Sequence, residues 1–447
     1  MVARNDDRNG GESADVAGIR DDVVSVDKDK RTPIGQLLVG KRRPQQLDEA
    51  RARQAFDGDG VTVGVGGSER EVAAWAASGC MALTGREDGP PLGPPAGLVA
   101  GVRSICDSIA RASGVELDGL AMLAERAAIA GLARHGDRSC GEATRLLRAA
   151  DGWIAVTLAR DDDIASVPAW LETEQIRDVW PLVTQAVAQR QVAPLVERAR
   201  LLSLPVAALG CDTAGITARP SGATRTTDIA DAMVADLSAL WAGPLCGHIL
   251  QLAGARVIKV ESTGRPDGAR RGPEAFFDLM NGGKESVALD FDDDEQLDAL
   301  QRLVAAADVV IEASRPRVLE SLGIGRADHQ VWVSITGYGR GSDGVAFGDD
   351  GAVAGGLVVE DERGPCFCAD AIADPLTGLV AADLALGALA AGHAELIDVP
   401  LAGVAARFAG PTLQVDDPVD VAAPTARRLS ATAPGLGADT DHVLAGL

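Results

Sequence analysis

The chain has 447 residues and a formal net charge of −23, and 46% of its residues are hydrophobic but only 3% aromatic. Phosphate binding needs a cationic face, so this charge excludes nucleic acid as the expected partner. The length allows two or three domains. A core built from small aliphatic side chains is typical of helices packed on a mostly parallel sheet.

The cysteines and the amino-terminal residues bear on where the protein works. The seven cysteines are odd in number and scattered, and Cys366 and Cys368 are too close together for a CxxC metal pair, so we expect reduced thiols and no metal. The stretch MVARNDDRNGGESAD has no apolar core. No uncharged apolar run reaches the roughly 18 residues of a membrane span. We therefore expect a cytoplasmic protein without membrane contact.

In chain order, the first half changes character several times. Residues 1–58 are charged and lack periodicity, which predicts a disordered amino-terminal segment. Residues 59–212 form a first globular part, with helices expected at 98–112 and 139–150. A stretch rich in Thr, Gly, Ala, Arg and Pro follows, and its composition predicts a linker at 213–230.

Residues 231–447 alternate between short apolar strands and helical patterns. The expected strands are 234–237, 257–260, 286–289, 309–312 and 331–335. This alternation predicts an α/β fold, in which a Rossmann-like, doubly wound parallel sheet forms the large domain. A smaller α/β domain is expected within 59–212.

Five motifs in 231–447 follow one another in an order and spacing that one family shares. They are DLS…AGP at 236–244, GARVIKVE at 254–261, NGGKESVALD at 281–290, DVVIEASR at 308–315 and SITGYG at 334–339. Together these motifs resemble the family III CoA-transferases (CaiB/BaiF type), the group of formyl-CoA transferase and α-methylacyl-CoA racemase. The resemblance implies an acyl-CoA:carboxylate CoA-transferase that takes coenzyme A as a substrate, with an acyl-CoA and a carboxylic acid as partners. It also implies a homodimer, with an interlocked dimer as one arrangement.

The resemblance also implies site residues. Asp374, in the turn ADPLTG, matches the family's catalytic aspartate, and Asp370 is the competing candidate. A carboxylate is ionised at neutral pH without a base, and its attack on a thioester gives a mixed anhydride and then an aspartyl-CoA thioester. Asp374 also suits a helix N-cap, a structural role compatible with the catalytic one.

Six further residues are candidate contacts of coenzyme A. Positions that line the nucleotide and pantetheine in the family are matched by Leu289, Ala313, Ser314 and Arg315. Two lysines, Lys259 and Lys284, are candidate donors to its phosphates.

Two alternatives to CoA transfer stay open. Racemase members pair the aspartate with a histidine in a Gly-His-Asp segment, and the matching residues here are Gly348, Asp349 and Asp350. The usual second base is therefore absent, which favours acyl transfer over an α-methylacyl-CoA racemase-like activity. The other alternative is a non-catalytic paralogue that binds acyl-CoA.

The order of the parts differs from that of the family. Residues 151–210 resemble the family's small domain, yet they precede the large domain. Aligning the GLVA segments at 97–100 and 378–381 places Gly93 opposite Asp374. The simplest interpretation is two partial copies in tandem, of which the first supplies the small domain and lacks the nucleophile.

Overall fold

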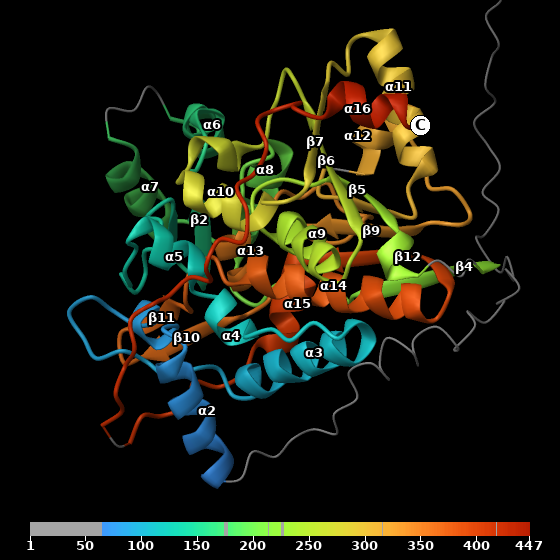
Figure 1. Cartoon of the computed structure of the whole chain (residues 1–447). Helices are drawn as coiled ribbons and strands as arrows, with labels where there is room; N and C mark the ends of the chain where they lie inside the picture. Colours follow the sequence, from blue (N-terminus) through green and yellow to red (C-terminus); the bar gives the residue numbers. More distant parts are fainter. Residues whose placement is uncertain (1–64, 174–177, 213, 225–227, 315, 417) are drawn as a thin grey trace, which may run out of the picture. The chain divides into compact units, whose positions relative to one another are not determined.

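The computed structural model of the chain describes residues 65–447, apart from short gaps at 174–177, 213, 225–227, 315 and 417 (Figure 1). The expected disordered segment 1–58 lies outside the described residues. The chain divides into two units, Met1–Gln45 and Gln46–Leu447, and every described residue belongs to the second unit.

A seven-stranded sheet organises this unit, in the order β4-β12-β9-β8-β5-β6-β7. The strands are β4 (Thr217–Thr224), β12 (His393–Pro400), β9 (Val331–Thr336), β8 (Val309–Glu312), β5 (Met233–Leu237), β6 (Arg256–Ser262) and β7 (Glu285–Leu289). From β12 to β7 all neighbours run parallel, and chain order reverses direction at β5. This is the predicted doubly wound α/β sheet, and the prediction is confirmed.

Helices cover both faces of the sheet. Neighbouring strand residues point to opposite faces: Val234 packs in one core with α9 (Ala242–Leu252) and α14 (Ala373–Ala390). Ala235 packs in a second core with α11 (Asp294–Ala306). The short helices α12 (Pro316–Ser321) and α16 (Thr440–Ala445) also contribute to this second core through Leu319 and Val443.

Helix α14 lies at the centre of the first core. It is long and apolar enough to cross a membrane by length and composition, but 72% of it is buried inside the protein. Its outer side packs against α3 (Leu98–Ser113), which confirms the helix predicted at 98–112 (Figure 1). At Gly378 an added Cβ would lie 2.7 Å from the carbonyl oxygen of Ala242, so the α14–α9 contact requires a residue without a side chain there.

The remaining elements of the first half fall into two groups. Helices α2 (Val65–Ala77), α4 (Gly119–Met122) and α5 (Glu125–Ala130) lie near α3 in the sequence. The buried hydrophobic side chains of these three helices are part of the same core as α14. The strands β1 (Thr144–Arg148), β2 (Trp153–Thr157) and β3 (Val206–Ala208) form a separate antiparallel sheet. This smaller sheet packs with α6 (Asp161–Leu171), α7 (Val179–Ala188) and α8 (Val192–Leu201).

Two expectations for the first half need correction. The helix expected at 139–150 is wrong: β1 pairs antiparallel with β2, with Leu146 opposite Ala155. Strand pairing overrides local helix propensity there. The stretch 213–230, expected as a linker, contains the edge strand β4, in which Pro220 lies opposite Glu395 of β12. Proline is tolerated at a sheet edge because no neighbour there needs its missing N–H.

The two GLVA segments occupy different places in their helices. Gly97 precedes α3 with a positive φ of 86°, whereas Gly378 lies inside α14. Gly93 lies before α3, beside Leu413. The tandem-copy interpretation, and the domain boundaries drawn from it, stay predictions.

The remaining described elements connect these layers. They are α10 (Glu274–Asn281), α13 (Gly348–Ala354), α15 (Leu401–Phe408), the hairpin β10 (Val358–Asp361) and β11 (Gly364–Phe367), and the 3-10 turns η1 (Met81–Leu83), η2 (Ile229–Asp231) and η3 (Gly268–Arg271).

A buried ion pair secures the start of the large sheet. Lys284 and Asp236 both have side chains that are 0% exposed, and Lys284 Nζ lies 2.8 Å from Asp236 Oδ2. The same ammonium group donates to the carbonyl oxygen of Pro244 at 2.9 Å and to Asn281 Oδ1 at 3.0 Å. All three of its protons therefore have acceptors.

Replacing Lys284 tests this interaction. We expect Lys284→Met to lower the free energy of unfolding by about 3–5 kcal/mol, because it leaves Asp236 buried without its counter-ion. Arg302→Met, which breaks the exposed Arg302–Asp298 pair on α11, should cost less than about 1 kcal/mol. Urea unfolding midpoints measure both, and equal losses would contradict a special role for the buried pair.

Candidate active site

Asp374 is the second residue of α14 (Ala373–Ala390), and a strained turn leads into it. Ala369 and Ala371 have positive φ values of 54° and 42°, a region that side chains other than glycine rarely adopt. Asp370 lies between them and is fully buried. Strained backbone of this kind is concentrated at functional sites.

A second acidic turn meets the first at Gly348, where α13 (Gly348–Ala354) begins. A Cβ at Gly348 would lie 2.6 Å from Asp374 Oδ2 and 2.3 Å from the carbonyl oxygen of Ala371. Only glycine permits so close an approach. The next residue, Asp349, accepts a hydrogen bond from the backbone N–H of Ala371 at 3.1 Å.

Threonines of the smaller sheet hold the two aspartates of α13. Thr157 donates through its hydroxyl to Asp350 Oδ1 at 2.9 Å, and Thr144 donates to Asp349 Oδ2 at 3.3 Å. The two threonines lie opposite each other on β1 and β2, with hydroxyl oxygens 3.0 Å apart. Asp350 Oδ2 is buried and has no hydrogen-bond partner among the described residues.

A single arginine from the first half of the chain reaches these carboxyl groups. Arg126 on α5 pairs with Asp370 through both arms: Nε to Oδ2 at 2.9 Å and Nη2 to Oδ1 at 2.5 Å. Its guanidinium carbon also lies 5.5 Å from the centre of the Trp241 ring. The two-armed geometry fixes Asp370 and leaves neither of its oxygens free.

We call Asp349, Asp350, Asp370 and Asp374 the acid cluster. The pKa of Asp374 is raised to about 7: burial raises it most, Arg126 lowers it, and the carboxyl groups of Asp349 and Asp370 raise it. Burial likewise raises the pKa of Asp349 to about 6 and that of Asp350 to about 7. Asp349, Asp350 and Asp374 therefore hold protons near neutral pH. Asp374 keeps part of its surface exposed, whereas the other three are buried.

The expected coenzyme A contacts lie partly together. Ala313 is exposed and Ser314 is partly buried, directly after β8, where β8 runs beside β5 at their carboxyl ends. Ligands of doubly wound sheets bind at this edge, at the point where strand order reverses. Leu289 is buried at the end of β7, two strands away from β5. Arg315 lies outside the described residues.

The structure corrects the expectation for the two lysines. Lys259 is 2% exposed, donates to the carbonyl oxygen of Ser238 at 2.7 Å and lies 2.9 Å from Asp267 Oδ2. The protons of Lys284 are also all engaged inside the protein. Neither lysine presents its charge to a phosphate outside, because both neutralise buried carboxylates.

Two exposed arginines near the same edge were missed. Arg265 follows β6, and Arg271 ends η3. A Cβ at Gly268 would lie 3.8 Å from Arg271 Nη2 and 3.3 Å from the side chain of Leu240, which follows β5. Neither arginine forms a salt bridge within the described part of the chain. The basic candidates drawn from the sequence all lie inside the five motifs. Arg265 and Arg271 lie after the motif GARVIKVE, so they were not among these candidates.

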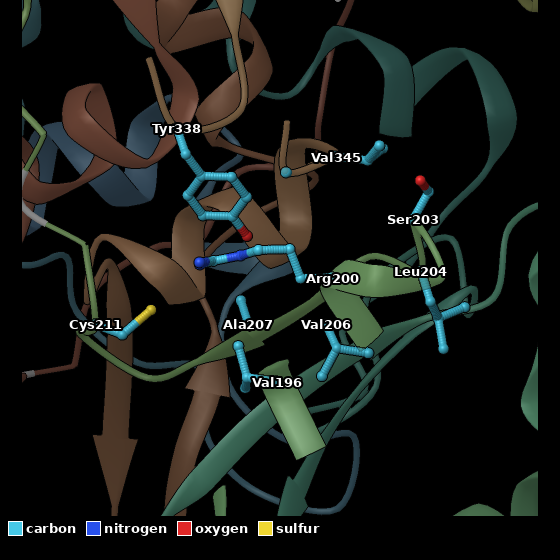
Figure 2. A pocket seen from close by; sticks show the side chains of 10 residues that line it. Val196, Arg200, Ser203, Leu204, Val206, Ala207, Cys211, Tyr338 and Val345 are labelled. Atoms are coloured by element: carbon cyan, nitrogen blue, oxygen red, sulfur yellow. The ribbon is translucent and has the colours of Figure 1, made fainter. Parts of the chain in front are cut away.

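A small pocket lies between the smaller sheet and the loop after β9. Figure 2 shows the ring of Tyr338 beside the side chain of Arg200, with Cys211 close by. Its volume of about 20 Å³ holds little more than one water molecule. Burial and the nearby Asp350 raise the pKa of Tyr338. The pocket is too small for an acyl-CoA.

Comparisons with known proteins place the second half of the chain. Residues 229–438 match the CoA-transferase family III model. A succinyl-CoA–D-citramalate CoA-transferase of Chloroflexus aurantiacus is 32% identical over 182 residues, which is 36% of this chain and 44% of that protein. A probable fatty acyl-CoA transferase of Mycobacterium tuberculosis is 33% identical over 227 residues, 44% of this chain and 57% of that protein.

Human succinyl-CoA:glutarate CoA-transferase is 34% identical over 182 residues, 36% of this chain and 40% of that protein. A solved CAIB/BAIF family protein of Brucella suis has 29% identity and a TM-score of 0.37, and the match covers 41% of this chain and 55% of that one. The chain spans about half the length of the curated relatives it matches.

The doubly wound sheet with an acidic turn at one helix start defines an α/β protein, and its second half is similar to CoA-transferases. Residues 229–438 match the CoA-transferase family III model, which confirms the resemblance drawn from the five motifs. The matched segment contains the whole acid cluster. Arg126, Thr144 and Thr157 lie outside it.

The protons held by Asp349, Asp350 and Asp374 make stability depend on pH. An aspartate in the unfolded chain ionises near pH 3.9, so between about pH 4 and pH 7 the folded protein binds more protons, and its stability falls as pH rises. Asp350→Asn keeps the acceptor that Oδ1 provides and removes a buried charge. We expect this variant to be more stable than wild type by about 1 kcal/mol or more at about pH 8, with little difference at about pH 5.

Thermal melting across this pH range measures the effect. Asp107→Asn, at an exposed site on α3, is the matched control. Its melting temperature should stay close to that of the wild-type protein at every pH. A destabilised Asp350→Asn protein at about pH 8 would contradict the raised pKa.

Proposed function

We propose that the protein is an acyl-CoA:carboxylate CoA-transferase in which Asp374 is the nucleophile. The family III segment supports the class of reaction. The observation that carries the choice of nucleophile is the contrast between two carboxyl groups. Asp370 is 0% exposed and has both oxygens paired with Arg126, while Asp374 keeps exposed surface beside Gly348.

The proposed reaction starts with attack of an Asp374 oxygen on the thioester carbonyl of the acyl-CoA. The C–S bond breaks, coenzyme A leaves as thiolate, and a mixed anhydride forms. The thiolate then attacks the aspartyl carbonyl, which releases the donor acid and leaves an aspartyl-CoA thioester. An acceptor carboxylate reverses these steps and regenerates Asp374. Backbone N–H groups of the glycine-bearing turn at Gly348 are suited to stabilise the developing oxyanion.

We further propose that coenzyme A lies along the carboxyl edge of the large sheet, past Ala313 and Ser314. Arg265 and Arg271 replace the two buried lysines as the cations for its phosphates, since they are exposed at that edge. Two guanidinium groups suit bidentate contacts with phosphate oxygens. A homodimer and a cytoplasmic location stay part of this proposal. Light scattering, which measures the molar mass in solution, tests the homodimer.

The racemase-like alternative would need a second base near Asp374. Asp349 stands where racemases have histidine, but both of its oxygens accept hydrogen bonds, from Ala371 and Thr144. This engagement makes Asp349 a poor proton shuttle, so it favours transfer. Exchange of the substrate's α-proton in deuterated water, without CoA transfer, would reverse that preference.

Hydroxylamine trapping tests the nucleophile. The protein is incubated with a mixed panel of acyl-CoAs and hydroxylamine, which converts an activated aspartyl group into a stable hydroxamate. Peptide mass spectrometry should find the hydroxamate on Asp374, only when acyl-CoA is present. Asp374→Asn should abolish it, and Asp383→Asn, on the same helix, should retain it.

Other outcomes of this experiment decide between the alternatives. A hydroxamate on Asp370 would overturn the choice of nucleophile. No hydroxamate, with coenzyme A binding still detected by calorimetry, would favour the non-catalytic paralogue.

The coenzyme A position has its own test. We expect the double variant Arg265→Gln with Arg271→Gln to bind coenzyme A about tenfold or more weakly, because charge-assisted bonds to phosphate contribute about 1.5–3 kcal/mol each. The loss should shrink at high salt, which screens exposed charges. Arg302→Gln, at an exposed site on α11, is the control, and an equal loss there would contradict the assignment.

A further inference from the structure

Arg126 lies outside the segment that matches the family, yet it forms the cationic side of the acid cluster. It belongs to α5 (Glu125–Ala130), more than a hundred residues before the matched segment begins at residue 229. The Arg126–Asp370 pair joins residues 244 positions apart. The titratable groups of the matched segment that act on Asp374 are the carboxyl groups of Asp349 and Asp370, so the positive charge comes from Arg126.

The surroundings of Asp374 show why one positive charge matters there. The titratable groups that act on Asp374 are Arg126 on α5, Asp349 on α13 and Asp370 before α14. Asp350 adds a further buried carboxyl to α13. Of these groups Arg126 alone is cationic. In a buried site each extra carboxylate raises the cost of ionising the next one, and a nearby guanidinium offsets that cost.

The geometry also separates the two aspartates of the turn. Arg126 takes both oxygens of Asp370 and stacks near the ring of Trp241, which precedes α9 at the carboxyl edge of β5. Asp370 is thereby withdrawn into an internal ion pair. The neighbouring Asp374 is left with its exposed surface.

We propose that Arg126 is a positioning residue for CoA transfer: it holds Asp370 in an internal ion pair and supplies the positive charge that lets Asp374 act as a carboxylate. This inference rests on the proposed function. It makes the amino-terminal half a part of the site, together with Thr144 and Thr157, which orient the aspartates of α13.

Three variants of the full-length protein test this inference through the pH dependence of hydroxamate formation on Asp374. Arg126→Gln should move the acid limb of the profile to higher pH by about 1–3 units, which lowers the rate tenfold or more at about pH 6. Arg126→Lys keeps the charge and should shift the profile less. Asp370→Asn removes a carboxylate and should shift the limb to lower pH. A purely structural role would not produce shifts of opposite sign.

A second ion pair on the same helix provides the matched control. Arg427 pairs with Glu125, the neighbour of Arg126, through two contacts of 2.5 and 3.0 Å. Its side chain is 26% exposed and that of Glu125 1%, close to the 30% and 0% of the Arg126–Asp370 pair. Arg427→Gln should cost similar stability and leave the pH midpoint unchanged.

The outcomes separate this inference from the proposed function. An unchanged midpoint in Arg126→Gln, with a wild-type protein that forms the hydroxamate, overturns the role of Arg126 alone. If Arg126→Gln does not fold, Asp370→Asn decides: an upward or absent shift overturns the inference. A wild-type protein that forms no hydroxamate at any pH overturns the proposed function itself.

Discussion

The ion pair between Arg126 and Asp370 connects the two halves of the chain at the point where the chemistry is expected. Four buried or partly buried carboxyl groups cannot all ionise in so small a volume without compensation. One guanidinium supplies part of it, and protons supply the rest, as the raised pKa values of Asp349, Asp350 and Asp374 indicate. The site therefore depends on a residue that comes from outside the family segment.

Much of the large sheet could be predicted from sequence because its signals are local. Short apolar strands alternate with helices, and turns rich in glycine separate them. The hydrophobic periodicity and the positions of these turns are enough to indicate a doubly wound fold. The five motifs are equally local, and each overlaps one strand of the sheet. The candidate nucleophile Asp374 came instead from the resemblance to the family, through the turn in which it lies.

The rest depended on contacts that local patterns do not carry. In the sequence, Lys259 and Lys284 look like surface cations. Only the fold shows that each forms a buried ion pair, with Asp267 and Asp236 respectively. The composition of β4 indicates a linker, because an edge strand needs few of the residues that mark a central one. Arg126 gave no signal, since its partner lies 244 residues further on.

A direct measurement of the carboxyl groups tests the central claim, that the acid cluster shares one cation and holds protons at neutral pH. Infrared difference spectra between about pH 6 and pH 8 detect the carbonyl band of protonated carboxyl groups. We expect a band in the wild-type protein that weakens in Asp374→Asn and in Asp349→Asn and persists in Asp107→Asn. Absence of any protonated carboxyl at about pH 6 would contradict the account.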